Sequence, residues 1–186
     1  MRPAVFLDRD GTINEDLHYL HEPDKVILCP HAGEALQQLQ QAGYALIVIT
    51  NQSGVGRGYF PIEDVHAVND RLSELLQPWG VQILKYYIAP EAPDQPSIGR
   101  KPQPAFIFQA RDEFDLDLPR SYFIGDKQVD LQTGWNAGLK ASILVRTGKG
   151  QKEEQTYPEL AQKACICDHL LDAARHILSA KTTSAR

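Results

Sequence analysis

Short apolar segments rich in β-branched residues alternate with helical patterns along this chain, and this alternation constrains its fold more than any other feature. Five segments are typical of strands, at residues 4–7, 45–50, 83–88, 122–124 and 141–145. Between most of them, apolar residues recur at helical spacing, in residues 32–42, 62–79, 105–114 and 129–137. This order favours a parallel sheet with helices on both faces. We therefore predict an α/β fold with a doubly wound, Rossmann-like parallel sheet.

The pattern continues to the end of the chain and indicates one domain. A further strand and helix are predicted near residues 164–167 and 169–180, which places the domain at residues 1–180 and a flexible tail at residues 181–186. Two long irregular stretches remain, residues 14–30 and 89–102, and loops of this length in a compact domain are usually functional. No insertion is long enough for a large cap domain. We expect loops to close a pocket, with residues 14–22 and 51–60 as one wall and 89–100 as the other.

Charge and cysteine content narrow the possible partners. The net charge of −5 argues against nucleic-acid binding, which usually needs a basic face. No run of about 18 apolar residues is present, so we expect no membrane partner. Three cysteines, Cys29, Cys165 and Cys167, make a poor disulfide framework and fit a reducing compartment. With no signal-peptide pattern at the start, we expect a cytoplasmic location. We also expect a monomer.

Two carboxylates follow the first predicted strand, in the segment Phe6-Leu7-Asp8-Arg9-Asp10-Gly11-Thr12. Open α/β sheets bind ligands at the carboxyl ends of their strands, where Asp8 and Asp10 would lie. A spacing of two lets both side chains face one cavity, so that one can attack phosphorus while the other handles a proton. Taken alone, the same segment could also form a turn with Asx hydrogen bonds or a calcium-type loop.

Three more polar clusters follow other predicted strands or loops. Thr50-Asn51-Gln52-Ser53-Gly54 offers a hydroxyl, amides and backbone N–H groups to a phosphate. Arg100 and Lys101 supply positive charge, and the segment from Asp126 to Asp130 brings further carboxylates. Such an arrangement would be an odd coincidence in a purely structural protein.

In this order the four clusters resemble the four motifs of the haloacid-dehalogenase-like (HAD) phosphatase superfamily. The resemblance implies that Asp8 is the nucleophile that forms an aspartyl-phosphate, and that Asp10 is the general acid and then the base. It implies Mg²⁺ held by the Asp8 side chain, the Asp10 backbone carbonyl and Asp126. It further implies that the transferred phosphoryl group is bound by Thr50, Asn51 and Lys101. A carboxylate that attacks a phosphate dianion needs such neutralising cations.

Asp130 has two possible roles. It would orient Lys101 or a metal-bound water, or it would serve as an ordinary carboxylate at a helix start, where it favours the helix dipole.

The resemblance extends to one subfamily, carried by residues 8–14, 50–58 and 125–127. That subfamily contains D-glycero-D-manno-heptose 1,7-bisphosphate phosphatase and the histidinol-phosphate phosphatase domain, and the heptose enzyme is the closer match. It implies removal of the C7 phosphate from the heptose bisphosphate, a step toward activated heptose for surface glycans. Histidinol-phosphate hydrolysis is the alternative. A polynucleotide 3′-phosphatase is a third, against which the acidic composition counts.

Basic residues in or beside the motif loops favour a strongly anionic small substrate such as a sugar phosphate. They are Arg9, Arg57, Arg100, Lys101 and Lys127. We predict substrate contacts from Gln52, Ser53, Arg57 and Arg100. Arg57 is expected to hold a second phosphate because it lies in a flexible glycine-rich loop, although a solvated loop arginine would look the same in sequence.

One departure from the subfamily concerns zinc. Many members bind zinc in the loop before Arg100 through cysteine and histidine pairs. The matching positions here are Ala89, Glu91, Ser97 and Gly99. Since none of them is a strong zinc ligand, we expect no structural zinc.

Overall fold

A six-stranded parallel sheet forms the centre of the molecule, with strand order β3-β2-β1-β4-β5-β6. The computed structural model describes the backbone of residues 1–183 and the side chains of residues 1–180. The strands are β1 (Ala4–Leu7), β2 (Ala45–Asn51), β3 (Lys85–Ala89), β4 (Tyr122–Gly125), β5 (Ala141–Val145) and β6 (Cys165–Cys167). All neighbouring strands pair in parallel. The predicted doubly wound α/β sheet is confirmed.

Strand β1 occupies the middle of this sheet because all of its side chains are apolar. Each of its four residues is fully buried, as expected for a parallel strand that is covered on both faces. Val5 pairs with Leu46 of β2 on one side and with Tyr122 of β4 on the other. The chain order therefore reverses beside β1, which is where open α/β sheets form their ligand crevice.

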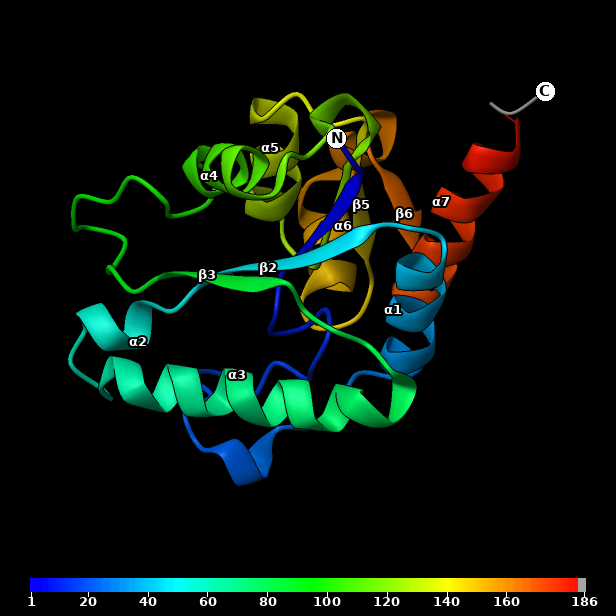
Figure 1. The fold of residues 1–186 in the computed structure, drawn as a ribbon. Helices are drawn as coiled ribbons and strands as arrows, with labels where there is room; N and C mark the ends of the chain where they lie inside the picture. The colour runs from blue at the N-terminus through cyan, green and yellow to red at the C-terminus, as the bar shows by residue number, and fades with distance from the viewer. Residues whose placement is uncertain (184–186) are drawn as a thin grey trace.

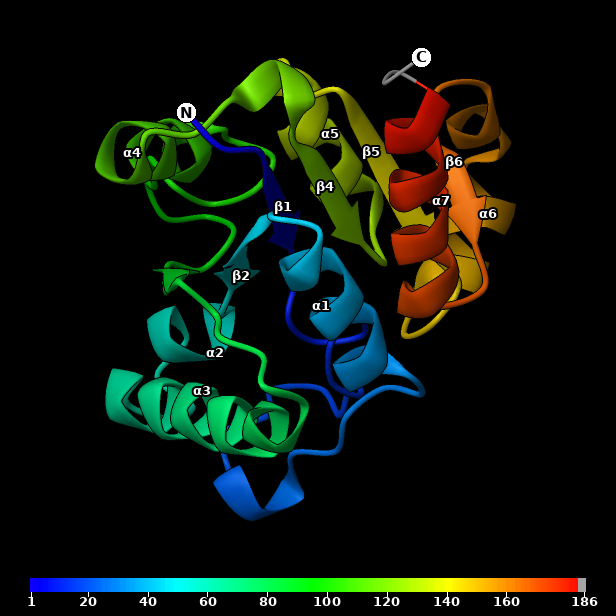
Figure 2. The same cartoon turned by 45° about the vertical axis from the view of Figure 1, so that its right-hand side comes forward.

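Helices cover both faces of the sheet (Figures 1 and 2). They are α1 (Ala32–Gln41), α2 (Ser53–Gly56), α3 (Ile62–Leu76), α4 (Ala105–Phe114), α5 (Gln128–Asn136), α6 (Gly150–Thr156) and α7 (Leu170–Thr183). Val5 and Leu7 share a core cluster with α1, α3 and α7. Ala4 and Phe6 point to the opposite cluster, which includes α4. The alternation of side chains along β1 thus divides the core into two layers.

Most predicted elements are present with ends shifted by one or two residues, as in β3 at Lys85–Ala89 instead of 83–88, and some helices differ more. The helix predicted over residues 62–79 ends at Leu76, and a 3-10 turn (Gln77–Trp79) follows because Pro78 lacks the backbone N–H that a helix interior needs. Helix α6 was not predicted, since its sequence has no apolar stripe. Helix α7 runs to Thr183, beyond the predicted domain end at 180, so the first three residues of the predicted tail are helical. The rest of that tail, residues 184–186, lies outside the described residues.

Loops rather than a cap domain surround the carboxyl end of the sheet. The long stretch after β1 is pinned by isolated bridges from Asn14 to Asp10 and to Leu28. It contains only one short 3-10 helix (Pro23–Lys25). Within the described part of the chain, no helix has the length and apolar character needed to cross a membrane.

Candidate active site

A cavity of about 460 Å³ opens at the carboxyl end of the sheet. Eight residues predicted from the sequence line it: Asp8, Asp10, Thr50, Asn51, Gln52, Ser53, Arg100 and Lys101. They come from the ends of β1 and β2 and from the loop before α4. The predicted convergence of separate polar clusters at one edge of the sheet is therefore present.

Asp8 is a buried carboxylate placed immediately after β1. Its backbone N–H donates to the carbonyl of Ile124 in β4, 3.0 Å away, which continues the sheet as far as Asp8. Burial by itself would raise the pKa of the Asp8 carboxyl, but Lys101 and Lys127 outweigh it and lower this pKa to about 2. The side chain is therefore ionised at neutral pH, as a carboxylate nucleophile must be.

Lys101 lies between two buried carboxylates. Its Nζ atom is 2.7 Å from Asp8 Oδ1 and 2.6 Å from Asp130 Oδ1. Burial favours the neutral amine, yet the Coulomb attraction of Asp130 and Asp8 prevails and raises the pKa of Lys101. A permanent positive charge is thus held beside Asp8.

Asn51 fixes the loop that carries Lys101. Its Oδ1 accepts the backbone N–H of Lys101 at 3.0 Å, and its Nδ2 donates to the Lys101 carbonyl at 3.3 Å. Both ends of the amide are therefore engaged with the protein. Its predicted contact with phosphate stays a prediction.

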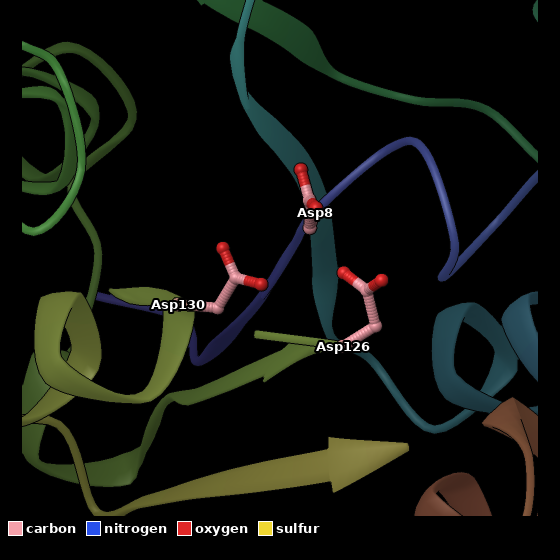
Figure 3. Close-up of side chains that lie close together, drawn as sticks. All are labelled: Asp8, Asp126 and Asp130. Carbon is pink, nitrogen blue, oxygen red and sulfur yellow. The ribbon is translucent and has the colours of Figure 1, made fainter. Parts of the chain in front are cut away.

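Figure 3 shows that the side chains of Asp8, Asp126 and Asp130 lie close together. Asp8, Asp126 and Asp130 each offer an oxygen within 4.8 Å of the others. Asp126 Oδ2 accepts the backbone N–H of Lys149 at 2.9 Å. Asp126 Oδ1 is buried and makes no hydrogen bond within the described residues, although Lys127 Nζ is 3.2 Å away. An unbonded carboxylate oxygen beside a second carboxylate is a suitable ligand for a hard cation such as Mg²⁺.

The electrostatics of Asp126 agree with a cation site. Burial raises the pKa of its carboxyl to about 8; Asp8 and Asp130 add to this, and Lys127 opposes it. Carboxylates packed this closely repel one another, and a divalent cation relieves that repulsion. The predicted ligands Asp8 and Asp126 are therefore adjacent and chemically suited to Mg²⁺. The part assigned to the Asp10 backbone carbonyl stays a prediction.

Asp130 combines the two roles that the sequence left open. Its carboxylate contacts Lys101, and its Oδ2 also accepts the backbone N–H of Lys127 at 3.0 Å, at the start of α5. Burial and the neighbouring Asp8 raise the pKa of Asp130. Asp130 therefore orients Lys101 and caps a helix at once.

Glycines allow the backbone to approach Asp126 closely. A Cβ atom at Gly11 would lie 2.3 Å from Asp126 Oδ2, and one at Gly148 would lie 2.4 Å from the same oxygen. Gly11 also has a φ of +87°, which other residues rarely adopt. The Thr147 hydroxyl donates to the Gly11 carbonyl at 2.7 Å and joins the two loops.

Gln52 lines the cavity and hydrogen-bonds to two other residues of the site, and its predicted substrate contact stays a prediction. Its Nε2 donates to Asp10 Oδ2 at 2.8 Å and to Thr50 Oγ1 at 2.7 Å. Both amide hydrogens are used in these two bonds, so Gln52 links the expected acid–base residue to the expected phosphate ligand. A substrate contact through its nitrogen would require one of them to break.

Some of the basic residues predicted near the substrate line the cavity, namely Arg100, Lys101 and Lys127. Arg100 lines the cavity, where its Nη1 donates to the Glu91 carbonyl at 3.0 Å. Burial lowers the pKa of Arg100, and the nearby Arg57 adds to this effect against Glu91. Arg57 itself is exposed and is not a lining residue. Arg9, expected near the substrate from its position, is fully buried and does not line the cavity either.

The loop at residues 89–102 is closed by its own hydrogen bonds. Ser97 Oγ donates to Glu91 Oε2 at 2.9 Å and accepts the backbone N–H of Arg100 at 3.0 Å. The contact between Ser97 and Glu91 joins two of the positions that correspond to zinc ligands in the subfamily that the sequence resembles. It gives the loop an internal connection made from a carboxylate and a hydroxyl.

The two predicted walls meet each other. The backbone N–H of Gly56 donates to the Pro90 carbonyl at 2.8 Å, so the loops at residues 51–60 and 89–100 touch directly. The loop at residues 14–22 does pack on residues 51–60 as predicted. His21 stacks on Phe60 with ring centroids 4.8 Å apart, and Tyr19 meets Tyr59 edge-on at 4.9 Å.

Sequence reasoning missed two charged residues of the cavity, Asp16 and Lys149. The Nζ of Lys149 lies 3.6 Å from Asp16 Oδ2. Lys149 follows strand β5, so the rule that functional groups follow parallel strands would have found it. Asp16 belongs to residues 14–22, which the sequence predicts as part of a pocket wall without indicating which of its side chains face the cavity.

Comparison with known proteins gives the same family from sequence and from fold. The HAD-hydrolase-like family model matches residues 98–173. A D-glycero-D-manno-heptose-1,7-bisphosphate 7-phosphatase from Chlorobaculum tepidum is 37% identical, over 97% of this chain and 96% of that protein. A D-glycero-beta-D-manno-heptose-1,7-bisphosphate 7-phosphatase from Yersinia pestis is 38% identical, over 79% of this chain and 82% of that protein.

A solved structure supports the relationship. It is the D,D-heptose 1,7-bisphosphate phosphatase from B. bronchiseptica, complexed with magnesium and phosphate. The two folds agree with a TM-score of 0.85 and 32% sequence identity, over 95% of this chain and 98% of that chain. The identity and the coverage leave one conclusion: this chain belongs to the family of HAD-like hydrolases formed by the heptose-1,7-bisphosphate 7-phosphatases.

Proposed function

We propose that this chain is a Mg²⁺-dependent phosphatase that removes the C7 phosphate of D-glycero-D-manno-heptose 1,7-bisphosphate. The observation that carries the proposal is the buried carboxylate of Asp8 in contact with Lys101, beside the carboxylate of Asp126. The relatives named above act on this substrate according to their names, and the related solved structure holds magnesium and phosphate.

The first step transfers the phosphoryl group to the protein. A carboxylate oxygen of Asp8 attacks phosphorus, and the bond from phosphorus to the C7 oxygen breaks with its electron pair on that oxygen. Asp10 gives its proton to the departing oxygen, so that the sugar leaves as an alcohol. Thr50 and Lys101 hold the phosphoryl oxygens during the transfer. The product is a mixed anhydride of Asp8 and phosphate.

The second step restores Asp8. Asp10, now a carboxylate, takes a proton from water as the water oxygen attacks phosphorus. The bond from phosphorus to the Asp8 oxygen breaks, and inorganic phosphate leaves. Mg²⁺, held by Asp8, the Asp10 backbone carbonyl and Asp126, would supply the positive charge that lets a carboxylate approach a phosphate.

A bisphosphate needs a second anion site, and we assign it to Arg100 with Arg57. Arg100 lines the cavity and Arg57 lies close enough to affect its pKa. Guanidinium groups are well suited to a phosphate, because each presents several N–H donors.

The test is a comparison of substrates. We expect kcat/KM for the heptose 1,7-bisphosphate to exceed that for histidinol phosphate, and both to depend on added Mg²⁺. A preference for histidinol phosphate would replace the proposed substrate, and release of phosphate from oligonucleotide 3′ ends would favour a repair enzyme. Neither result would change the assignment of Asp8.

We further propose a cytoplasmic monomer. Cys29, Cys165 and Cys167 are all free thiols, which suits a reducing compartment. Light scattering of the purified chain at several concentrations would test the monomer, and a mass that doubles with concentration would contradict it.

A further inference from the structure

Arg9 stands between the two expected catalytic carboxylates in the sequence, yet it is the largest fully buried side chain of the described residues. It does not line the cavity and so does not reach a substrate there. A guanidinium that is buried in this way is costly unless charged or polar partners surround it. Its partners therefore indicate its purpose.

The guanidinium of Arg9 contacts two side chains. Its Nε donates to Asp10 Oδ2 at 3.1 Å, and its Nη2 lies 3.0 Å from the same oxygen. On the far side, its Nη1 donates to Asn69 Oδ1 at 2.9 Å. Asn69 is a buried residue of α3, sixty positions further along the chain. Arg9 thus bridges the carboxylate of Asp10 to a helix outside the cavity.

The two oxygens of Asp10 are consequently unlike. Oδ2 faces the two nitrogens of Arg9 and also accepts the Gln52 Nε2 at 2.8 Å. Oδ1 accepts one hydrogen bond that the structure gives, from Asn14 Nδ2 at 2.9 Å. An oxygen already surrounded by N–H donors has no direction left in which to donate a proton of its own. The transferable proton therefore belongs on Oδ1.

We propose that Arg9, anchored by Asn69, is a positioning residue that holds Asp10 by Oδ2 so that Oδ1 delivers and collects the proton. This inference rests on the proposed function, because it assigns the proton to a group that acts in both phosphatase steps. It predicts that loss of the bridge harms proton transfer selectively. Attack by Asp8 on a substrate that needs no proton should survive.

Two phosphate esters separate these effects. A sugar phosphate leaves as an alkoxide and needs a proton, whereas 4-nitrophenyl phosphate leaves as a stable phenolate and does not. Hydrolysis of the aspartyl-phosphate needs Asp10 with both. The variants are Arg9→Met, which removes the charge, and Asn69→Leu, which removes only the anchor. The matched control is Ser73→Ala on the same helix, whose hydroxyl donates to the Asn69 carbonyl and contacts Tyr86 but not Arg9.

With Arg9→Met we expect single-turnover release of the sugar to fall by about 10- to 100-fold. We expect a rapid burst of about one nitrophenolate per active site, followed by slow turnover as the alkali-labile aspartyl-phosphate accumulates. Asn69→Leu should also slow single-turnover release of the sugar and turnover after the nitrophenolate burst, but by less than Arg9→Met does. Ser73→Ala should leave the ratio of the first-step rates with the two esters as it is in the unmodified chain. A purely structural role would lower the burst amplitude instead, because fewer sites would be folded.

The result that overturns the inference is an equal loss in the rate of the first step with both esters, measured as single-turnover sugar release and as the nitrophenolate burst rate, or no loss of single-turnover sugar release. If Arg9→Met does not fold, the same comparison is made with Asn69→Leu, and an unchanged ratio there overturns it as well. An unmodified chain without Mg²⁺-dependent turnover of either ester would overturn the proposed function first and this inference with it. The two failures are therefore distinguishable.

Discussion

Lys101 Nζ donates a hydrogen bond of 2.7 Å to Asp8 Oδ1, although 93 residues separate the two along the chain. Both side chains are almost completely buried. The pair joins the end of the central strand to the loop before α4, so it connects the folding of the sheet to the charge balance of the cavity. Its removal should therefore affect stability as well as turnover.

We expect Lys101→Met to lower the free energy of unfolding by about 3–5 kcal/mol, because it leaves Asp8 and Asp130 buried without their cation. Turnover should fall by at least about 100-fold, since the phosphoryl oxygens lose a fixed charge. Urea unfolding and phosphate release measure the two effects. Lys85→Met is the control: the half-exposed pair of Lys85 with Glu113 should cost only about 0–1 kcal/mol. An equal loss of unfolding free energy in the two variants would contradict the expectation that a buried ion pair is more costly to break than a half-exposed one.

Asp8→Asn should abolish turnover while the fold stays intact, because a neutral amide oxygen is a poor nucleophile toward phosphorus. Phosphate release and far-ultraviolet circular dichroism check the two halves of this statement. Asp112→Asn, which changes an exposed carboxylate on α4, should retain full activity. Retained turnover in the Asp8 variant would refute its assignment as nucleophile.

Removal of Mg²⁺ with a chelator should stop turnover and lower the unfolding temperature. At a Mg²⁺ concentration 100 times its Kd, binding should add about 2.7 kcal/mol of stability. Asp126→Asn should lose most of this gain, because the unbonded Oδ1 of Asp126 is the expected ligand. Thermal unfolding with and without Mg²⁺ measures the difference. An Asp126 variant that gains as much stability as the unmodified chain would show that the cation binds elsewhere.

Gly11→Ala and Gly43→Ala form a matched pair. Both glycines have a φ near +90°, but a Cβ at Gly43 meets nothing within 4 Å, whereas one at Gly11 meets Asp126 Oδ2 at 2.3 Å. Gly43→Ala should cost about 1–2 kcal/mol from backbone strain alone. Gly11→Ala should cost about 1–3 kcal/mol more and should also weaken stabilisation by Mg²⁺. If both variants respond to Mg²⁺ alike, the close approach to Asp126 does not matter for the cation.

Tyr86 should make the protein lose stability at alkaline pH. Burial raises the pKa of its phenol to about 12, against smaller lowering effects of the Ser73 hydrogen bond and of Arg9. In the unfolded chain this pKa is about 10. Between pH 10 and pH 12 the unfolded state loses the phenol proton that the folded state keeps. The contribution of Tyr86 to the free energy of unfolding is therefore complete below pH 10 and declines as the pH rises toward 12.

The corresponding variant is Tyr86→Phe, which has no proton to lose. The stability of the unmodified chain relative to this variant should fall by about 1.4 kcal/mol from pH 9 to pH 11. Urea unfolding at the two pH values measures it, with Tyr59→Phe at an exposed position as the control for loss of a hydroxyl. A difference that does not change with pH would contradict the raised pKa.

Elements with an apolar stripe were predictable from the sequence, and polar ones were not. Strand β5 and helix α4 have the predicted limits, because β-branched and periodic apolar residues define them locally. Helix α6 escaped because its only buried residue is Gly150, which packs against the Val145 carbonyl. Such a helix is specified by a tertiary contact rather than by its own pattern.

The same distinction holds for the cavity. Asp8, Lys101 and Asp126 could be placed from the sequence, since each follows a strand or loop that ends at the same edge of the sheet. The partners of Asn51 and Gln52 could not, because a side-chain amide bonds to whatever group tertiary packing brings within about 3 Å. Their roles depended on atoms far away in sequence.

The position of β1 has a consequence for synthesis of this protein on the ribosome. Of the six strands in this sheet, β1, which ends just before Asp8, comes first along the chain, and it pairs with β2 and with β4, whose first residue is Tyr122. A nascent chain that stops before β4 therefore exposes one side of its central strand, an edge open to misassociation with other chains. It also lacks Asp126, so a truncated translation product carries the proposed nucleophile Asp8 without the carboxylate expected to hold Mg²⁺ beside it.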